Sequence, residues 1–68
     1  MDTSAPFHVR ALFDYRAEGT AELTIRQGDI IQVIRQVESG WWDGVVVQTW
    51  VRGWFPSNYC APHQLDQD

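Results

Sequence analysis

Short runs of β-branched and aromatic residues follow one another along the chain at the spacing of β-strands. The runs 8–13 (HVRALF) and 29–37 (DIIQVIRQV) come first, and 41–47 (WWDGVVV) and 51–56 (VRGWFP) follow. The spacing in 29–37 would also allow a helix, but five of its nine residues are β-branched, which favours a strand. The pattern therefore predicts four strands.

Turn signals separate these runs. The pairs Gly28-Asp29 and Ser39-Gly40 precede the second and third runs, and such residues favour turns. Residues 48–50 predict a hairpin turn between the third and fourth runs, although the Asn-Gly or Asp-Gly pair typical of tight hairpins is absent. Short strands at this spacing, with no helical stretch, indicate a small antiparallel barrel or sandwich of the all-β class.

The length of 68 residues fits one small domain. We expect a flexible lead at 1–6, the domain at 7–61, and a flexible tail or the start of a linker at 62–68. The single cysteine, Cys60, cannot form an internal disulfide, and with His8 and His63 it offers too few ligands for a structural metal. The fold must therefore be held by packing. A lone thiol also fits a reducing, cytoplasmic compartment.

Composition excludes several classes of function. Nine acidic residues oppose five arginines, so the net charge of −4 argues against binding to a nucleic acid and suits a basic partner. No apolar run approaches the roughly 20 residues of a membrane span, and the N-terminus lacks the pattern of a signal peptide. Neither a glycine-rich phosphate loop nor a serine-histidine-acid set is present, so we expect no catalysis and no cofactor.

Four motifs occur in one register. The sequence ALFDY spans 11–15, acidic residues follow it in the next loop, WW occupies 41–42, and GWFPSNY spans 53–59. Together they resemble a Src-homology-3 (SH3) domain. The segments GWWDG and RGWFPSNY are also similar to those of SH3 domains in signalling and cytoskeletal adaptors and in fungal Ras exchange factors. The resemblance implies a small five-stranded barrel of two orthogonal antiparallel sheets, with one 3₁₀ turn at Ser57–Tyr59.

The same resemblance assigns the loops and the core. The RT loop would span 16–27, the n-Src loop 37–40 and the distal hairpin 48–50. The core positions implied by this register are Val9, Ala11, Leu23, Ile25, Ile31, Val33, Gly44, Phe55 and Cys60.

A ligand surface follows from the resemblance as well. A polyproline II helix is read by ridges of flat rings with polar tips, which tyrosine and tryptophan provide. Asn58 is placed to bond a ligand carbonyl, Phe13 lacks the hydroxyl of the tyrosine usual there, and Trp54 would widen one proline pocket. The residues at the family's ligand positions are Phe13, Tyr15, Trp41, Trp54, Pro56, Asn58 and Tyr59.

A charged pocket completes this surface. Glu22 stands at the RT-loop position whose acid pairs with a ligand arginine or lysine, and Trp41 borders it, so a guanidinium could stack on the indole. Other residues near this pocket are expected to add to the field: Glu18, Thr20, Glu38 and Asp43. The implied function is a monomeric interaction module that binds proline-rich segments with a flanking Arg or Lys, as an adaptor in intracellular signalling or cytoskeletal assembly.

Alternatives remain open at this point. A methyl-lysine reader also surrounds a cation with rings and an acid in a small β domain. A docking or dimerisation module, or one that recognises a folded partner, would use the same groove or the apolar hairpin around Trp50. Trp42 should face the opposite side of its strand from Trp41 and serve the fold, because adjacent strand residues point to opposite faces.

Overall fold

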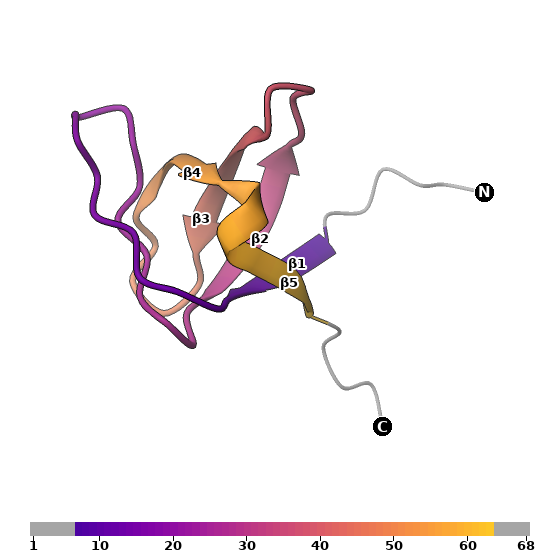
Figure 1. Cartoon of the computed structure of the whole chain (residues 1–68). Helices are drawn as coiled ribbons and strands as arrows, with labels where there is room; N and C mark the ends of the chain where they lie inside the picture. Colours follow the sequence, from indigo (N-terminus) through magenta and orange to yellow (C-terminus); the bar gives the residue numbers. More distant parts are fainter. Residues whose placement is uncertain (1–6, 64–68) are drawn as a thin grey trace.

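The computed structural model describes residues 7–63, which form five strands and one short 3₁₀ helix (Figure 1). The all-β class and the 3₁₀ turn agree with the prediction. Four strands coincide with the predicted runs, and their bounds differ by one or two residues. The elements in chain order are β1 (Phe7–Ala11), β2 (Ile30–Arg35), β3 (Trp41–Val46), β4 (Arg52–Pro56), η1 (Ser57–Tyr59) and β5 (Cys60–His63).

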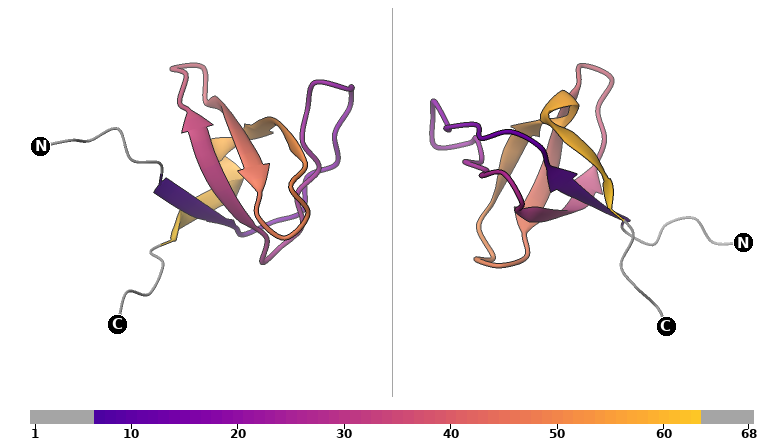
Figure 2. Two further views of the ribbon diagram at one scale, coloured as in Figure 1. Left: turned by 180° about the vertical axis from the view of Figure 1, so that it is seen from behind. Right: turned by 60° about the horizontal axis from the view of Figure 1, so that its bottom comes forward.

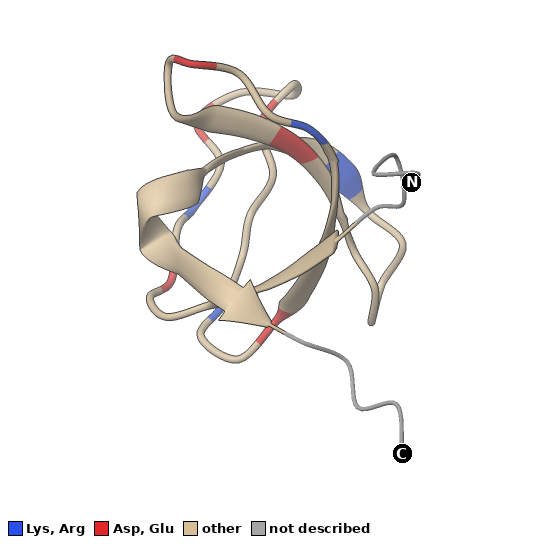
Figure 3. Ribbon diagram, turned by 90° about the vertical axis from the view of Figure 1, so that its right-hand side faces the viewer, with Lys and Arg blue, Asp and Glu red and all other residues tan. Residues whose placement is uncertain are grey.

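Hydrogen bonds join all five strands into one antiparallel sheet with the order β4-β3-β2-β1-β5. The sheet curls so that its strands surround the interior, as seen in two further views and in a view turned by 90° (Figures 2 and 3). The expected pair of sheets is therefore one continuous sheet that bends. No helix within residues 7–63 is long and apolar enough to cross a membrane.

The last strand, β5, shows no alternating pattern in the sequence. It pairs with β1, where His8 lies opposite His63 and Ala11 lies opposite Cys60. Pro62 and His63, which we expected to begin the tail, thus belong to the sheet. The expectations for residues 1–6 and 64–68 fall outside the described residues.

The hydrophobic core lies inside the curl of the sheet. Seven of the predicted core side chains are buried there, Gly44 is buried as well, and Val46 is a further member that the register did not predict. Cys60 is half-buried and packs against the core instead of lying within it. Burial raises the pKa of its thiol to about 11, which keeps the sulfur protonated and unreactive at neutral pH. The buried hydrophobic residues are Val9, Ala11, Leu23, Ile25, Ile31, Val33, Val46 and Phe55.

Two glycines in β3 and β4 allow neighbouring segments to pack closely against the sheet. A Cβ atom at Gly44 would lie 2.6 Å from Ile31 Cγ2 and 2.8 Å from Phe55 Cε1, so any side chain there would collide with the core. A Cβ atom at Gly53 would lie 2.9 Å from the backbone carbon of Glu22. Gly53, which sequence reasoning did not single out, therefore lets the RT loop lie directly on β4.

Backbone hydrogen bonds fix the RT loop in that position. Trp54 accepts a bond from the Leu23 N–H at 2.7 Å and donates one to the Ala21 carbonyl at 2.9 Å. At the base of the loop, the Asp14 carboxylate accepts the Gln27 N–H at 2.7 Å. The loop is therefore held at its base and against β4, which places the Glu22 backbone beside the middle of that strand.

Candidate functional site

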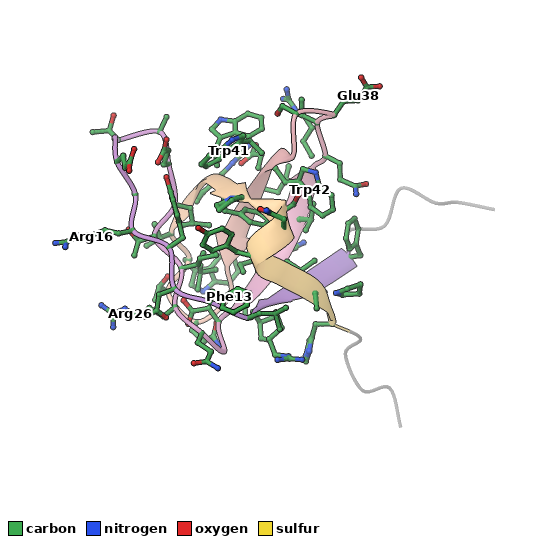
Figure 4. All side chains as sticks on the ribbon, viewed as in Figure 1. Phe13, Arg16, Arg26, Glu38, Trp41 and Trp42 are labelled. Carbon is green, nitrogen blue, oxygen red and sulfur yellow. The ribbon has the colours of Figure 1, made fainter. Side chains whose placement is uncertain are left out.

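Four aromatic rings from three segments of the chain form one unbroken row on the surface. Phe13 meets Tyr59 at a centroid distance of 6.0 Å, Tyr59 meets Tyr15 at 5.8 Å, and Tyr15 meets Trp41 at 5.7 Å. Each contact is edge-to-face, the geometry that aromatic pairs prefer. The side chains of Phe13 and Trp41 mark the two ends of the row (Figure 4). Four of the five rings predicted for the ligand surface thus lie in one row.

A shallow groove of about 510 Å³ runs along the Trp41 end of this row. It brings together five of the residues that we predicted to bind a ligand with three that we did not predict. Ser39, Gly40 and Ser57 are the additions. The sequence had assigned Ser39 and Gly40 to the n-Src loop and Ser57 to the 3₁₀ turn, but none of them to the ligand surface. The lining residues are Tyr15, Ser39, Gly40, Trp41, Pro56, Ser57, Asn58 and Tyr59.

Strand pairing explains why these groups converge. Trp41 at the start of β3 lies opposite Pro56 at the end of β4, so both point to the same face. The 3₁₀ helix η1 follows Pro56 directly and carries Asn58 and Tyr59 onto that face. The Ser57 N–H donates to the Gly40 carbonyl at 2.8 Å, which ties η1 to the n-Src loop.

The resemblance places Trp54 at one proline pocket, and the structure places it beside the RT loop. It lies two residues before Pro56, on the same face of β4, and is half-buried beside the RT loop. Its backbone forms an isolated parallel β-bridge with that of Glu22. It is not among the residues that line the groove. Trp54 therefore lies next to the acid of the charged pocket, on the face of β4 that it shares with Pro56.

Glu22 is held in a defined orientation by two hydrogen bonds. The Tyr15 hydroxyl donates to its Oε1 at 2.6 Å, and the Glu18 backbone N–H donates to the same oxygen at 2.9 Å. These bonds lower the pKa of the Glu22 carboxyl. The same hydrogen bond, together with desolvation and the negative charge of Glu22, raises the pKa of Tyr15 to about 12. At neutral pH the carboxylate is therefore charged and the hydroxyl protonated.

The other predicted acids differ in their surroundings. Glu18 is exposed on the RT loop, and its backbone, but not its side chain, contacts Glu22. Glu38 is exposed at the tip of the n-Src loop and points outward, away from Trp41 (Figure 4). Both carboxylates are exposed and add long-range attraction for a charged ligand, which salt screens beyond about 10 Å.

The expectation for Asp43 is wrong. Its side chain is buried and accepts two hydrogen bonds from Arg52, from Nη2 at 2.8 Å and from Nε at 3.2 Å. The carboxylate raises the pKa of the Arg52 guanidinium through these bonds. The charge of Asp43 is thus neutralised within the sheet and adds little to the field at the charged pocket.

The two remaining tryptophans lie outside the groove. Trp42 packs edge-on between Phe7, at a centroid distance of 5.9 Å, and Phe55, at 6.3 Å, so it serves the fold as expected. Trp50 is 79% exposed in the distal hairpin and has a φ of 64°, a left-handed backbone conformation that favours glycine. The sequence indicated that this hairpin is unusually apolar, but it did not indicate the left-handed backbone conformation at Trp50.

Comparison with known proteins identifies the family. A sequence profile of the SH3 domain matches residues 10–57. The chain belongs to the SH3 domain family. Against a LIM and SH3 domain protein of Caenorhabditis elegans, this SH3 domain is 39% identical over 61 residues, which cover 90% of this chain and 18% of the relative. It spans less than a fifth of the length of the first curated relatives that it matches.

Solved structures agree with this assignment. The C-terminal SH3 domain of Entamoeba histolytica myosin IB, bound to a peptide named EhFP10(GEF), is 35% identical with a TM-score of 0.78, covering 93% of this chain and all of that one. The Acanthamoeba myosin I SH3 domain, bound to Acan125, is 39% identical with a TM-score of 0.78, covering 87% of this chain and 98% of that one. SH3 domains are interaction modules without catalytic activity.

Proposed function

We propose that this SH3 domain binds proline-rich segments of partner proteins that carry an arginine or lysine beside the prolines. It would act as a monomeric adaptor module in cytoplasmic signalling or cytoskeletal assembly. One observation carries the proposal: the unbroken row from Phe13 to Trp41 ends beside a charged and oriented carboxylate, Glu22. Two structural neighbours that were solved with bound partners support it.

The geometry suits a stiff, extended ligand. A polyproline II helix has three residues per turn and no internal hydrogen bonds, so its proline rings can lie between protein rings while its carbonyls remain free to accept bonds. Asn58 is exposed at the groove and supplies an amide donor, and the Trp41 indole N–H is a second potential donor. Little order is lost on binding, because the ligand is already extended.

Orientation of the ligand would come from charge. The row of rings offers similar contacts to a ligand running in either direction, whereas Glu22 lies near only one end. A basic residue placed there would pair with the carboxylate and lie over the Trp41 indole. Because the groove is shallow and small, we expect weak and rapidly exchanging binding, with a Kd of roughly 1–100 μM.

A charge-removing variant tests this proposal. Glu22→Gln keeps the size of the side chain and its acceptor for Tyr15 but removes the negative charge. We expect weaker binding of a proline-rich peptide with a flanking arginine and little change for the same peptide with alanine there, measured by titration calorimetry at low and at high salt. If both peptides lose affinity equally, the assignment of the charged pocket is wrong. If a trimethyl-lysine peptide without prolines binds better than either, the proposed function is wrong.

A further inference from the structure

The carboxylate of Glu22 is partly occupied by the domain's own donors. Both of its hydrogen bonds, from the Tyr15 hydroxyl and from the Glu18 N–H, reach Oε1. Among residues 7–63 no donor reaches Oε2. Each carboxylate oxygen has about two acceptor positions. Those on Oε1 are therefore filled, and those on Oε2 have no partner among the described residues.

We infer that the domain takes a ligand cation through Oε2 alone, and that it therefore binds lysine and arginine with similar affinity. The inference rests on the proposed function, because it concerns Glu22, whose carboxylate is bonded to the groove residue Tyr15. Arginine gains its usual advantage over lysine when two parallel N–H groups reach both oxygens of a carboxylate. With Oε1 filled, that forked contact is blocked. A guanidinium must then bind end-on to one oxygen, as the ammonium group of lysine does.

Tyr15 is the residue whose hydroxyl prevents a guanidinium from bonding both oxygens of Glu22. Its ring is held between Trp41 and Tyr59 at centroid distances of 5.7 and 5.8 Å, so the hydroxyl has little freedom to turn away. The bond of 2.6 Å to Oε1 has the usual length for a hydroxyl that donates to a charged carboxylate. Tyr15 therefore acts as a specificity-determining positioning residue in addition to its place in the row of rings.

The other groups around the pocket do not restore a strong preference for arginine. Trp41 attracts either cation through its ring face, although arginine stacks somewhat better. Asp43 cannot bind a ligand guanidinium through both of its carboxylate oxygens, because Arg52 already bonds both. Glu18 is exposed and is the one nearby carboxylate that must be controlled for in an experiment. These considerations predict that wild-type affinities for arginine and lysine ligands agree within about threefold.

Three peptides test the inference. They share one proline-rich core and differ only in the flanking residue, which is arginine, lysine or the neutral isostere citrulline. Calorimetry would measure their Kd values for the wild type, for Tyr15→Phe and for Glu18→Gln. In Tyr15→Phe one acceptor position on Oε1 opens, so the preference for arginine over lysine should rise to about tenfold. Any direct contact between the Tyr15 hydroxyl and the prolines is lost equally for all three peptides and cancels in the ratio.

A second measurement distinguishes a changed environment of the Glu22 carboxylate from a general loss of structure in Tyr15→Phe. Titration of the Glu22 side-chain carboxyl by ¹³C NMR should show a higher pKa in Tyr15→Phe than in the wild type, while Glu18→Gln should keep the wild-type ratio of affinities because its backbone N–H remains. An unchanged ratio in Tyr15→Phe, or a wild-type preference for arginine above about threefold, would overturn the inference and leave the proposed function intact. If the citrulline peptide binds as well as the arginine peptide, or if none of the three binds, the proposed function fails and the inference fails with it.

Discussion

Removal of the Trp41 ring should weaken peptide binding while the fold survives. Trp41 is 36% exposed, and a tryptophan side chain buries at most about 250 Å², so roughly 90 Å² remains for a ligand to cover. At about 25 cal/mol per Å² of apolar surface, that area corresponds to about 2.2 kcal/mol of binding free energy, or a loss of about 40-fold in affinity. Trp41 is not part of the buried core, so Trp41→Ala should unfold at nearly the wild-type temperature.

Trp50→Ala is the matched control for this prediction. It removes the same side chain from the distal hairpin, where the ring is 79% exposed and lines no part of the groove. Both variants would be titrated with one proline-rich peptide, with amide chemical shifts as the readout, and their unfolding would be followed by circular dichroism. Our reasoning would be refuted if Trp41→Ala bound within about threefold of the wild type, or if Trp50→Ala lost as much affinity.

Further predictions concern packing, backbone strain and pH. Gly44→Ala should lower the free energy of unfolding by roughly 1–3 kcal/mol in urea denaturation, because its Cβ would lie 2.6 Å from Ile31 Cγ2; a loss below about 0.5 kcal/mol would contradict this packing. Trp50→Gly should be more stable than Trp50→Ala by about 1 kcal/mol in the same assay, since glycine adopts the left-handed φ of 64° without strain; equal stabilities would show that the hairpin rearranges. The pKa of Tyr15 is raised from 10.0 to about 12 in the folded state, so its contribution to stability is fully present below pH 10.0 and is lost as the pH rises toward 12. Alkaline unfolding curves should show this decline in the wild type and a smaller one in Tyr15→Phe.

Local patterns predicted the parts of the fold that depend on neighbouring residues. Alternation and β-branching located β1 to β4, and the register of the motifs located seven buried core side chains. β5 was not visible in the pattern, because its four residues include a proline and owe their extended form to pairing with β1, about 50 positions earlier. Val46 was missed although it lies two residues after the predicted core position Gly44, on the same face of β3.

The electrostatics of the site were the least predictable part. The sequence indicated an acid at Glu22 but not which of its oxygens is free, since that depends on a hydroxyl seven residues away across the RT loop. Asp43 and Arg52 meet only because β3 and β4 pair in one particular register. Trp54 lies on the same face of β4 as Pro56, but the RT loop packs directly beside it. A long-range contact of this kind leaves no periodic signal in the sequence.

The pairing of β1 with β5 also decides how the domain responds to mechanical load. Because His8 lies opposite His63, the start of β1 and the end of β5 lie at the same end of this strand pair. Tension between these two points acts along the hydrogen bonds of an antiparallel ladder, which run perpendicular to the strands, so the bonds would break one after another from that end. Stretching should therefore peel β1 from β5 at low force, before it disturbs the strand pair that carries Trp41.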